Sequence, residues 1–317
     1  MVPVSWYGIE ETPKPAVGLK PYLKLCGKLL QRKAFFYVML FQFLSNLIAS
    51  ITTTAGGLVK NYWAGVQNLQ NQLFSLLGSA LFALGLWLVN KYLLNYSWRA
   101  MLFSTTVLLN VMDMPFTFLT VYNIVRNQYF YLGETVLYEV PSAANFVVAT
   151  FIIVEMADEG NEGMVYGLLT TTANLGEPFG NAISNQLFGL FRPALSDSAN
   201  YIEDTGRFRQ VVALSFVVSY FFSFLSLLAL PLLPSQKAEA QRRKRDWSEN
   251  EGYMWFTIVL LSVCLAYSLT VNFLSLNEST MCLTIAGGEG CEDEEPGASL
   301  LQVAAAASNV AAAAAGR

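Results

Sequence analysis

The sequence contains no histidine and few charged residues of either sign. It has four cysteines among 317 residues, and Asp, Glu, Lys and Arg together make up 13%, against about 25% in an average soluble protein. Without imidazole, the chain lacks the most common general base, metal ligand and near-neutral proton switch. A phosphate-binding loop of the Walker type and a Gly-x-Ser-x-Gly nucleophile motif are also absent from the sequence. We therefore expect neither an enzyme nor ATP-driven transport within this chain, and no metal or other cofactor.

Apolar segments of membrane-spanning length are what the sequence has in abundance. Apolar residues make up 54% of the chain, and a bilayer core of about 30 Å requires roughly 20 such residues per helix. Seven segments with few charges are predicted to span: 34–52, 73–89, 100–121, 130–154, 164–191, 211–233 and 254–276. The alternative, a soluble all-helical protein, would need much more polar surface. The expected fold class is therefore an all-α integral membrane protein.

Lysine and arginine are distributed unevenly among the connecting segments. Most of them lie in the N-terminal arm 1–33, in the loop after the second span, and in the segment 235–252 after the sixth span. Because cytoplasmic loops carry an excess of Lys and Arg, this pattern predicts a cytoplasmic N-terminus. Residues 21–33 also have the pattern of a basic amphipathic helix, which typically lies on the inner membrane surface.

Two glycosylation-type sequons give opposite indications about this topology. Asn277-Glu278-Ser279 follows the seventh span, on the side predicted to be non-cytoplasmic, and precedes Cys282 and Cys291, which could pair in an oxidising compartment. Asn95-Tyr96-Ser97 lies on the side predicted to be cytoplasmic. Short sequons arise by chance, so the charge distribution decides the prediction.

The stretch 155–184 joins an acidic, glycine-marked loop to an apolar segment with a polar stripe. At 100° per residue, the polar residues of the stripe fall within about 80° of one another. They are Thr170, Asn174, Glu177, Asn181 and Asn185. Polar groups are costly in hydrocarbon, so this helix is expected to turn its stripe toward a cavity. Glu177 precedes Pro178, which predicts either a simple kink or a broken helix of the kind that forms transporter sites.

Three further spans carry polar residues at helical spacing. These are Gln42, Asn46, Ser50 and Thr53 in the first span, Thr106, Asn110, Asp113 and Thr117 in the third, and Glu134, Tyr138, Pro141 and Asn145 in the fourth. Together they predict a solvated central cavity, although such residues also join helices by hydrogen bonds. The sixth and seventh spans hold no charge and are expected to face lipid or lie at the periphery.

The carboxylates within the spans are the strongest candidates for function. A carboxylate near the bilayer centre costs at least about 2.5 kcal/mol, so Asp113 is expected to have a substrate or proton role, with a structural ion pair or a protonated acid as the alternatives. Glu134 and Glu139 lie about 140° apart on a helix, so at most one of them is expected to share the cavity.

Three segments resemble the second half of folate–biopterin transporters, a branch of the major facilitator superfamily. They are 63–102, 130–140 and the stretch 155–184. The resemblance rests on Leu132-Gly133-Glu134, on the loop ending Glu162-Gly163, and on Thr172-Ala173-Asn174-Leu175-Gly176 in the following helix. The chain departs from that family's pattern at Met156-Ala157-Asp158-Glu159, where Cys and Pro residues are usual, and in having six spans plus one instead of twelve.

The resemblance implies a six-helix half of a facilitator-type bundle with one added helix. The expected organisation is a basic arm (1–33), a six-span half-domain (34–234), a basic linker (235–252), a seventh span (253–276) and an acidic, alanine-rich tail (277–317). Such a half cannot form a complete alternating-access pathway alone. The chain is therefore expected to be a fragment, an incorrectly predicted gene product, or a half-transporter that pairs with a homodimer partner or another half.

The function implied by the resemblance is secondary transport of folate- or pterin-like solutes across the plasma membrane or an organelle membrane. Its partners would be the lipid bilayer and the solute, with no nucleic acid. The residues expected to line the substrate or ion pathway are Asp113, Glu134, Glu139, Asn145, Asn174, Glu177 and Asn181. The alternatives are a non-transporting membrane scaffold or partner subunit, and a seven-span receptor, which would require an extracellular N-terminus.

Overall fold

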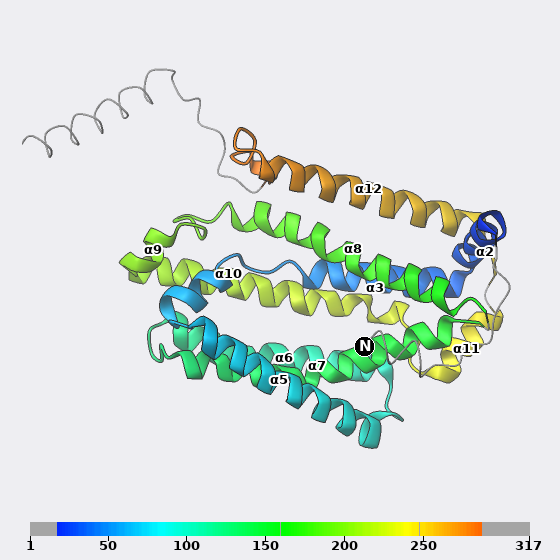
Figure 1. Cartoon of the computed structure of the whole chain (residues 1–317), viewed down its shortest axis with the longest axis horizontal. Coiled ribbons are helices and arrows are strands. Elements are labelled where there is room, and N and C mark those ends of the chain that lie inside the picture. The colour runs from blue at the N-terminus through cyan, green and yellow to red at the C-terminus, as the bar shows by residue number, and fades with distance from the viewer. Residues whose placement is uncertain (1–17, 159, 247, 287–317) are drawn as a thin grey trace, which may run out of the picture.

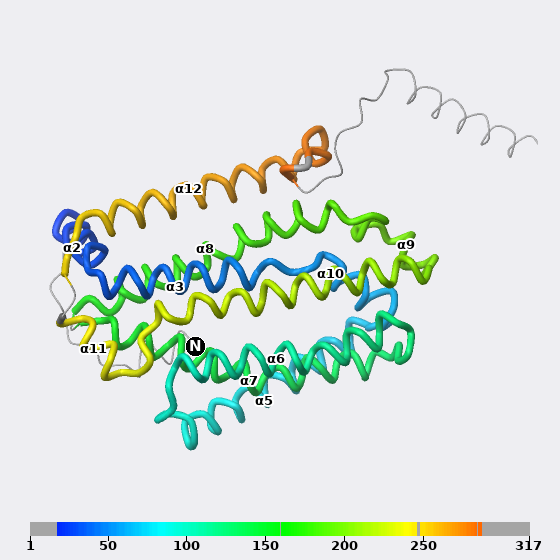
Figure 2. The backbone as a smooth tube through the Cα atoms, turned by 180° about the vertical axis from the view of Figure 1, so that it is seen from behind, coloured from blue at the N-terminus to red at the C-terminus, as the bar shows by residue number. Residues whose placement is uncertain are grey.

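The computed structural model describes residues 18–158, 160–246 and 248–286, and all seven predicted segments are helices within it. The long helices lie side by side, with α2 and α11 at one end and α9 at the other (Figures 1 and 2). The main helices are α2 (Leu19–Gln31), α3 (Lys33–Ala49), α5 (Asn68–Leu88), α6 (Trp98–Val121), α7 (Gln128–Met156), α8 (Glu162–Phe188), α10 (Gly206–Leu225), α11 (Lys237–Asp246) and α12 (Glu251–Leu276). Shorter helical pieces are α4 (Gly56–Leu58), η1 (Val59–Trp63), η2 (Val89–Leu93), α9 (Ser198–Glu203), η3 (Ser226–Leu232) and η4 (Thr284–Ala286).

Five of these helical segments are long and apolar enough to cross a membrane: Asn68–Leu93, Trp98–Val121, Gln128–Met156, Gly206–Leu232 and Glu251–Leu276. Helix α3 is apolar but shorter, with 17 residues. Helix α8 has 27 residues, and its polar stripe lowers its hydropathy. No β-strand occurs in the described ranges. The chain is thus an all-helical, multi-pass integral membrane protein, and part of each end of the predicted organisation, including Cys291, lies outside the described residues.

Two apolar clusters hold the bundle together at its two ends. One cluster, near α2 and α11, includes Phe35, Met39, Ile152, Leu169 and Leu233. The other, near α9, includes Ile51, Trp63, Phe188, Tyr201 and Phe208. Along α3 and α6, the polar residues at 42–46 and 106–113 fall between the buried members of these clusters in sequence. The apolar ends therefore fix the helices while leaving a polar middle.

Helix α8 packs against α3 through glycines one turn apart. A Cβ at Gly180 would lie 2.5 Å from the Leu47 carbonyl oxygen, and one at Gly176 would lie 2.9 Å from the Phe43 carbonyl oxygen. Thr172 and Ser184 are buried on the same face. Small residues at this spacing let two membrane helices approach closely. This small-residue face of α8 determines how the helix is rotated about its axis, because it is the face that contacts α3.

The helix of the first predicted span ends before its predicted boundary at residue 52. The polar residues after the helix join neighbouring helices. Helix α3 ends at Ala49, and the Thr53 amide donates to Ser219 Oγ at 2.7 Å while its hydroxyl bonds to Ser215 Oγ at 2.8 Å. The Thr52 amide similarly donates to Ser184 Oγ at 3.0 Å. Backbone groups released from a helix at membrane depth must find such partners. Thr53 therefore joins helices instead of lining a cavity.

The basic segments predicted to share one side of the membrane do meet at one end. Arg99, at the start of α6, forms an ion pair with Glu239 of α11 at 3.5 Å. The Asp158 carboxylate forms ion pairs with Arg32, which follows α2, at 2.8 Å and with Lys244 of α11 at 2.7 Å. Lys244 and Arg32 lower the pKa of the Asp158 carboxyl, against the opposing effect of burial. That this end faces the cytoplasm stays a prediction.

At the opposite end, Asp204 binds two arginines. Its carboxylate accepts from Arg126 at 2.7 and 2.9 Å and from Arg209 at 2.6 and 2.9 Å. The Arg126 guanidinium also lies 4.6 Å from the centre of the Trp63 ring, within the range of cation–π attraction. Burial opposes ionisation of Asp204, but the two arginines outweigh it and lower its pKa to about 2. This cluster fastens the loop after α6 to the start of α10.

We expect Asp204→Asn to destabilise the bundle by about 1–3 kcal/mol, a loss between those typical of removing one partner from an exposed and from a buried ion pair. Asparagine tolerates the left-handed conformation that Asp204 adopts (φ 54°), so the backbone stays unstrained. Because folding lowers the pKa of Asp204, its ionised carboxylate stabilises the folded protein. The stabilisation is complete above about pH 4 and is lost as the pH falls toward 2. The check is the thermal midpoint in detergent at pH 7 and at stepwise lower pH.

The matched control is Asp197→Asn, which removes the same charge nearby. Asp197 accepts only from the Ala199 amide as a helix cap, and asparagine caps equally well. Equal midpoints for the two variants at pH 7 would show that the Asp204 cluster does not stabilise the protein.

Candidate functional site

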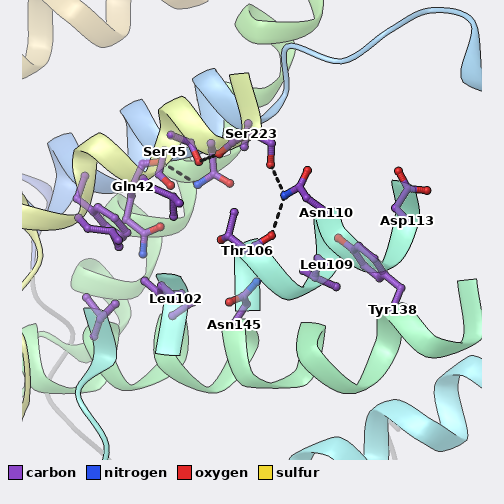
Figure 3. Close-up of a pocket in the computed structure, with 18 of the residues that line it drawn as sticks. Gln42, Ser45, Leu102, Thr106, Leu109, Asn110, Asp113, Tyr138, Asn145 and Ser223 are labelled. Atoms are coloured by element: carbon purple, nitrogen blue, oxygen red, sulfur yellow. Dashed lines mark hydrogen bonds between the residues drawn. The ribbon is translucent and has the colours of Figure 1, made fainter. Parts of the chain in front are cut away.

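A polar cavity of about 570 Å³ lies between α3, α6, α7 and the α10–η3 segment (Figure 3). Its volume is in the range of small-molecule sites. The polar residues that line it are Gln42, Ser45, Asn46, Thr106, Asn110, Asp113, Glu134, Tyr138, Asn145, Ser223 and Ser226. Apolar residues such as Phe41, Leu102 and Leu230 complete the walls. The four helical segments therefore enclose a site with mixed polar and apolar character.

Asp113 is held in a fixed orientation at one end of this cavity. Its Oδ2 accepts from the Tyr220 hydroxyl at 2.6 Å, and its Oδ1 accepts from the Thr117 hydroxyl at 3.0 Å. A carboxylate oxygen has two acceptor positions, so each oxygen keeps one for another donor. Glu134, nearly two turns into α7, lies near enough for its charge to interact with that of Asp113. The cavity thus carries two carboxylates on facing helices.

Amide side chains extend the polar lining from Asp113 along the cavity. The Asn110 amide donates to the Thr106 carbonyl at 2.7 Å and to Ser223 Oγ at 2.8 Å, as Figure 3 shows, which leaves its Oδ1 as an acceptor. The Asn145 Oδ1 accepts from the Thr105 hydroxyl, which leaves its Nδ2 as a donor. Gln42 is 8% exposed, and its side-chain amide has no partner among the described residues. These groups give the cavity unused donors and acceptors.

Three of the predicted pathway residues line this one cavity, and a fourth is excluded as the helical angle required. Asp113, Glu134 and Asn145 share the cavity. Glu139 instead packs toward α5, where its Cγ would lie 3.1 Å from a Cβ at Gly78. The expectation that at most one of Glu134 and Glu139 shares the cavity is confirmed, and Glu134 is that residue.

The other predicted pathway residues lie outside the Asp113 cavity, and their role in the pathway stays a prediction. Asn174, Glu177 and Asn181 line a groove of about 380 Å³ between α8 and α12, with Asn272 and Ser275 on its far side. The cause is the small-residue face of α8, which packs on α3 and turns the polar stripe outward. Helix α8 also continues through Pro178, so the broken-helix alternative does not apply.

The sixth span, which was expected to face lipid or lie at the periphery, contributes residues to the cavity. Tyr220 holds Asp113, Ser223 bonds to Asn110, and Ser226 lines the cavity. A signal for this was present, because Ser215, Ser219, Ser223 and Ser226 recur at helical spacing along one face. Helix α12, the seventh predicted span, lies at the edge of the bundle beside α8 (Figure 1).

The cavity lining described here contains no lysine or arginine. Lys60, whose charge acts on Glu134, bonds to Asn71 Oδ1 at 2.7 Å. Within the described ranges, no group of three or more His, Cys, Asp or Glu side chains is arranged to hold a metal ion. The site is therefore suited to binding an organic solute through carboxylates, amides and hydroxyls.

Comparison with known families agrees with this arrangement of helices. A model of the BT1 family matches residues 23–246, from within α2 to the end of α11. The chain belongs to the BT1 family. This confirms the resemblance to folate–biopterin transporters that the motifs of α7 and α8 indicated. No curated protein and no solved structure matches the chain.

Membership of the BT1 family makes the chain a membrane transporter protein, and the family's members are transporters, not enzymes. The bilayer and a small-molecule solute are accordingly its partners. Helix α12 begins after the matched region ends, so it is an addition to the part of the chain that defines the family. The groove beside Glu177 lies between a family helix and this added helix.

Proposed function

We propose that the BT1 chain moves folate- or pterin-like solutes by secondary transport, and that the cavity around Asp113 is its solute site. The observation that carries this proposal is the cavity itself, in which two carboxylates and several amides converge within the helical bundle. Polar groups there are costly in lipid and are retained where they bind solutes or ions. The predicted organisation, with a cytoplasmic N-terminus, is part of the proposal.

We further propose that α3 to α10 form a six-helix half of the major-facilitator type. The support is an internal symmetry of helix packing. The helices form two successive triplets, the first being α3, α5 and α6 and the second α7, α8 and α10. The first helix of each triplet packs on the second helix of the other, as α3 does on α8 and α7 does on α5. Both contacts use glycines, since a Cβ at Gly85 of α5 would lie 2.9 Å from the Val140 carbonyl oxygen of α7. Two inverted three-helix repeats would give this pattern.

The outward polar stripe of α8 favours a second six-helix unit beside this one. Asn174, Glu177 and Asn181 are exposed, although they lie in the middle of a helix of spanning length. Groups of this kind need a polar partner within the membrane. We propose that a second copy of the chain covers the part of the stripe that α12 leaves open.

The test is uptake of labelled folate and labelled biopterin by cells that lack endogenous carriers. Cells producing the full chain should accumulate one or both solutes well above vector-only cells. The amount of the chain in the membrane fraction must be measured in parallel. A chain that reaches the membrane but gives no uptake would refute the proposal and favour the non-transporting scaffold.

A further inference from the structure

We propose that the cavity binds the pteridine head of its solute through Asp113 and disfavours the anionic glutamate tail. This rests on the proposed function and names the part of the solute that this site recognises. The 2-amino-4-oxo pteridine ring presents two parallel N–H donors, from the 2-amino group and from ring N3. Parallel donors of this kind match the two oxygens of a carboxylate, as in arginine–carboxylate pairs.

Asp113 has the geometry that this recognition needs. Tyr220 and Thr117 each occupy one acceptor position on a different oxygen of the carboxylate, at 2.6 and 3.0 Å. Each oxygen therefore keeps one position for a solute N–H, and the carboxylate plane is fixed before the solute arrives. A preoriented acceptor pair lowers the entropy cost of binding.

The amides beyond Asp113 complement the remainder of such a ring. Thr106 and Asp113 are seven residues apart on α6, so the polar lining extends about 10 Å along the helix axis. Over that length the cavity offers the acceptor Asn110 Oδ1 and the donors Asn145 Nδ2 and Gln42 Nε2. A pteridine carries acceptors at its 4-oxo group and ring nitrogens. The apolar walls, including Phe41 and Leu109, suit the faces of a flat ring.

The charge of the cavity argues against binding the other half of a folate. The p-aminobenzoyl-glutamate tail carries two carboxylates, whereas the lining has Asp113 and Glu134 and no cation. An anion placed beside two carboxylates in a low-dielectric site is repelled and lacks a compensating partner. Lys60 acts on Glu134 but lies outside the cavity lining, where it bonds to Asn71. The site should therefore prefer an unconjugated pterin to a conjugated folate.

The test is ligand binding by the purified full chain in detergent, measured by titration calorimetry. Biopterin should bind at least tenfold more tightly than p-aminobenzoyl-glutamate, with folate between them. Equal or tighter binding of the tail fragment, or no binding of biopterin, would overturn the assignment. Because binding is measured without transport, biopterin binding in a chain that gives no uptake would refute the proposed function and leave this inference intact.

A variant pair assigns the binding to Asp113. Asp113→Asn should weaken biopterin at least tenfold, because one acceptor oxygen becomes an amide donor facing the ring's own donors. Asp197→Asn, which removes the same charge outside the cavity, should bind like wild type. Unchanged affinity in Asp113→Asn would contradict the role of Asp113. If that variant does not fold, the comparison of head and tail fragments on the wild-type chain still decides the proposal.

Discussion

Asp113→Asn is expected to reduce solute uptake at least tenfold while the amount of protein in the membrane changes little. Asparagine has the same shape, so it fits among Tyr220, Thr117 and the cavity wall. It removes the negative charge and one acceptor, and hydrogen bonds to charged groups contribute about 1.5–3 kcal/mol. Such a loss corresponds to a tenfold effect or more. The measurement is the initial uptake rate divided by the amount of chain in the membrane fraction.

The same measurement separates a solute role from a structural one. If Asp113 only joined α6 to α10 through Tyr220, both Asp113→Asn and Tyr220→Phe would lower the thermal midpoint, and normalised uptake would survive in each. We expect instead that Tyr220→Phe reduces uptake less than Asp113→Asn, because the carboxylate remains. Wild-type uptake by Asp113→Asn would remove this residue from the pathway.

Gly180→Ala is expected to destabilise the protein by about 2 kcal/mol, or roughly 5 °C in thermal midpoint. The added Cβ would lie 2.5 Å from the Leu47 carbonyl oxygen and 2.8 Å from Ser50 Cβ. The nearer atom belongs to the backbone of α3, so the conflict is relieved only if the two helices separate. The measurement is thermal unfolding of the purified variant in detergent.

Gly167→Ala on the same helix is the matched control. A Cβ at Gly167 meets no atom within 4 Å, so this substitution adds helix propensity without a clash. It should leave the midpoint unchanged or raise it slightly. A Gly180→Ala protein as stable as Gly167→Ala would mean that α8 does not pack closely on α3.

Much of the fold could be predicted from the sequence because membrane helices are specified by length and apolarity. The segments 100–121 and 254–276, for example, match α6 and α12 to within a few residues. The distribution of Lys and Arg also predicted which basic segments lie together, as the Arg99–Glu239 pair shows. Both signals are local properties of the chain, and neither depends on how the helices pack.

The composition of the site was harder to predict because it depends on helix rotation. The stripe of α8 was predicted correctly as a stripe, but the packing surface formed by Gly176, Gly180 and Ser184 on another face was not predicted. Those residues pack on α3 and direct Glu177 toward α12. On α10 a polar face was missed, because its serines and Tyr220 are uncharged and the prediction relied on charged residues. A polar stripe identifies one face of a helix, and only the small-residue face identifies its neighbour.

The central claim is that the solute occupies the cavity between α3, α6, α7 and α10. Solute protection of a single cysteine tests it most directly, using Ala149→Cys in the cavity wall and Ala199→Cys on α9 as the control. The free cysteines Cys26 and Cys264 are first replaced by Ser and Ala, respectively. Saturating biopterin should slow labelling of the Ala149→Cys variant by a hydrophilic thiol reagent at least fivefold and leave the control unchanged. Equal labelling rates at Ala149→Cys with and without biopterin would contradict the account.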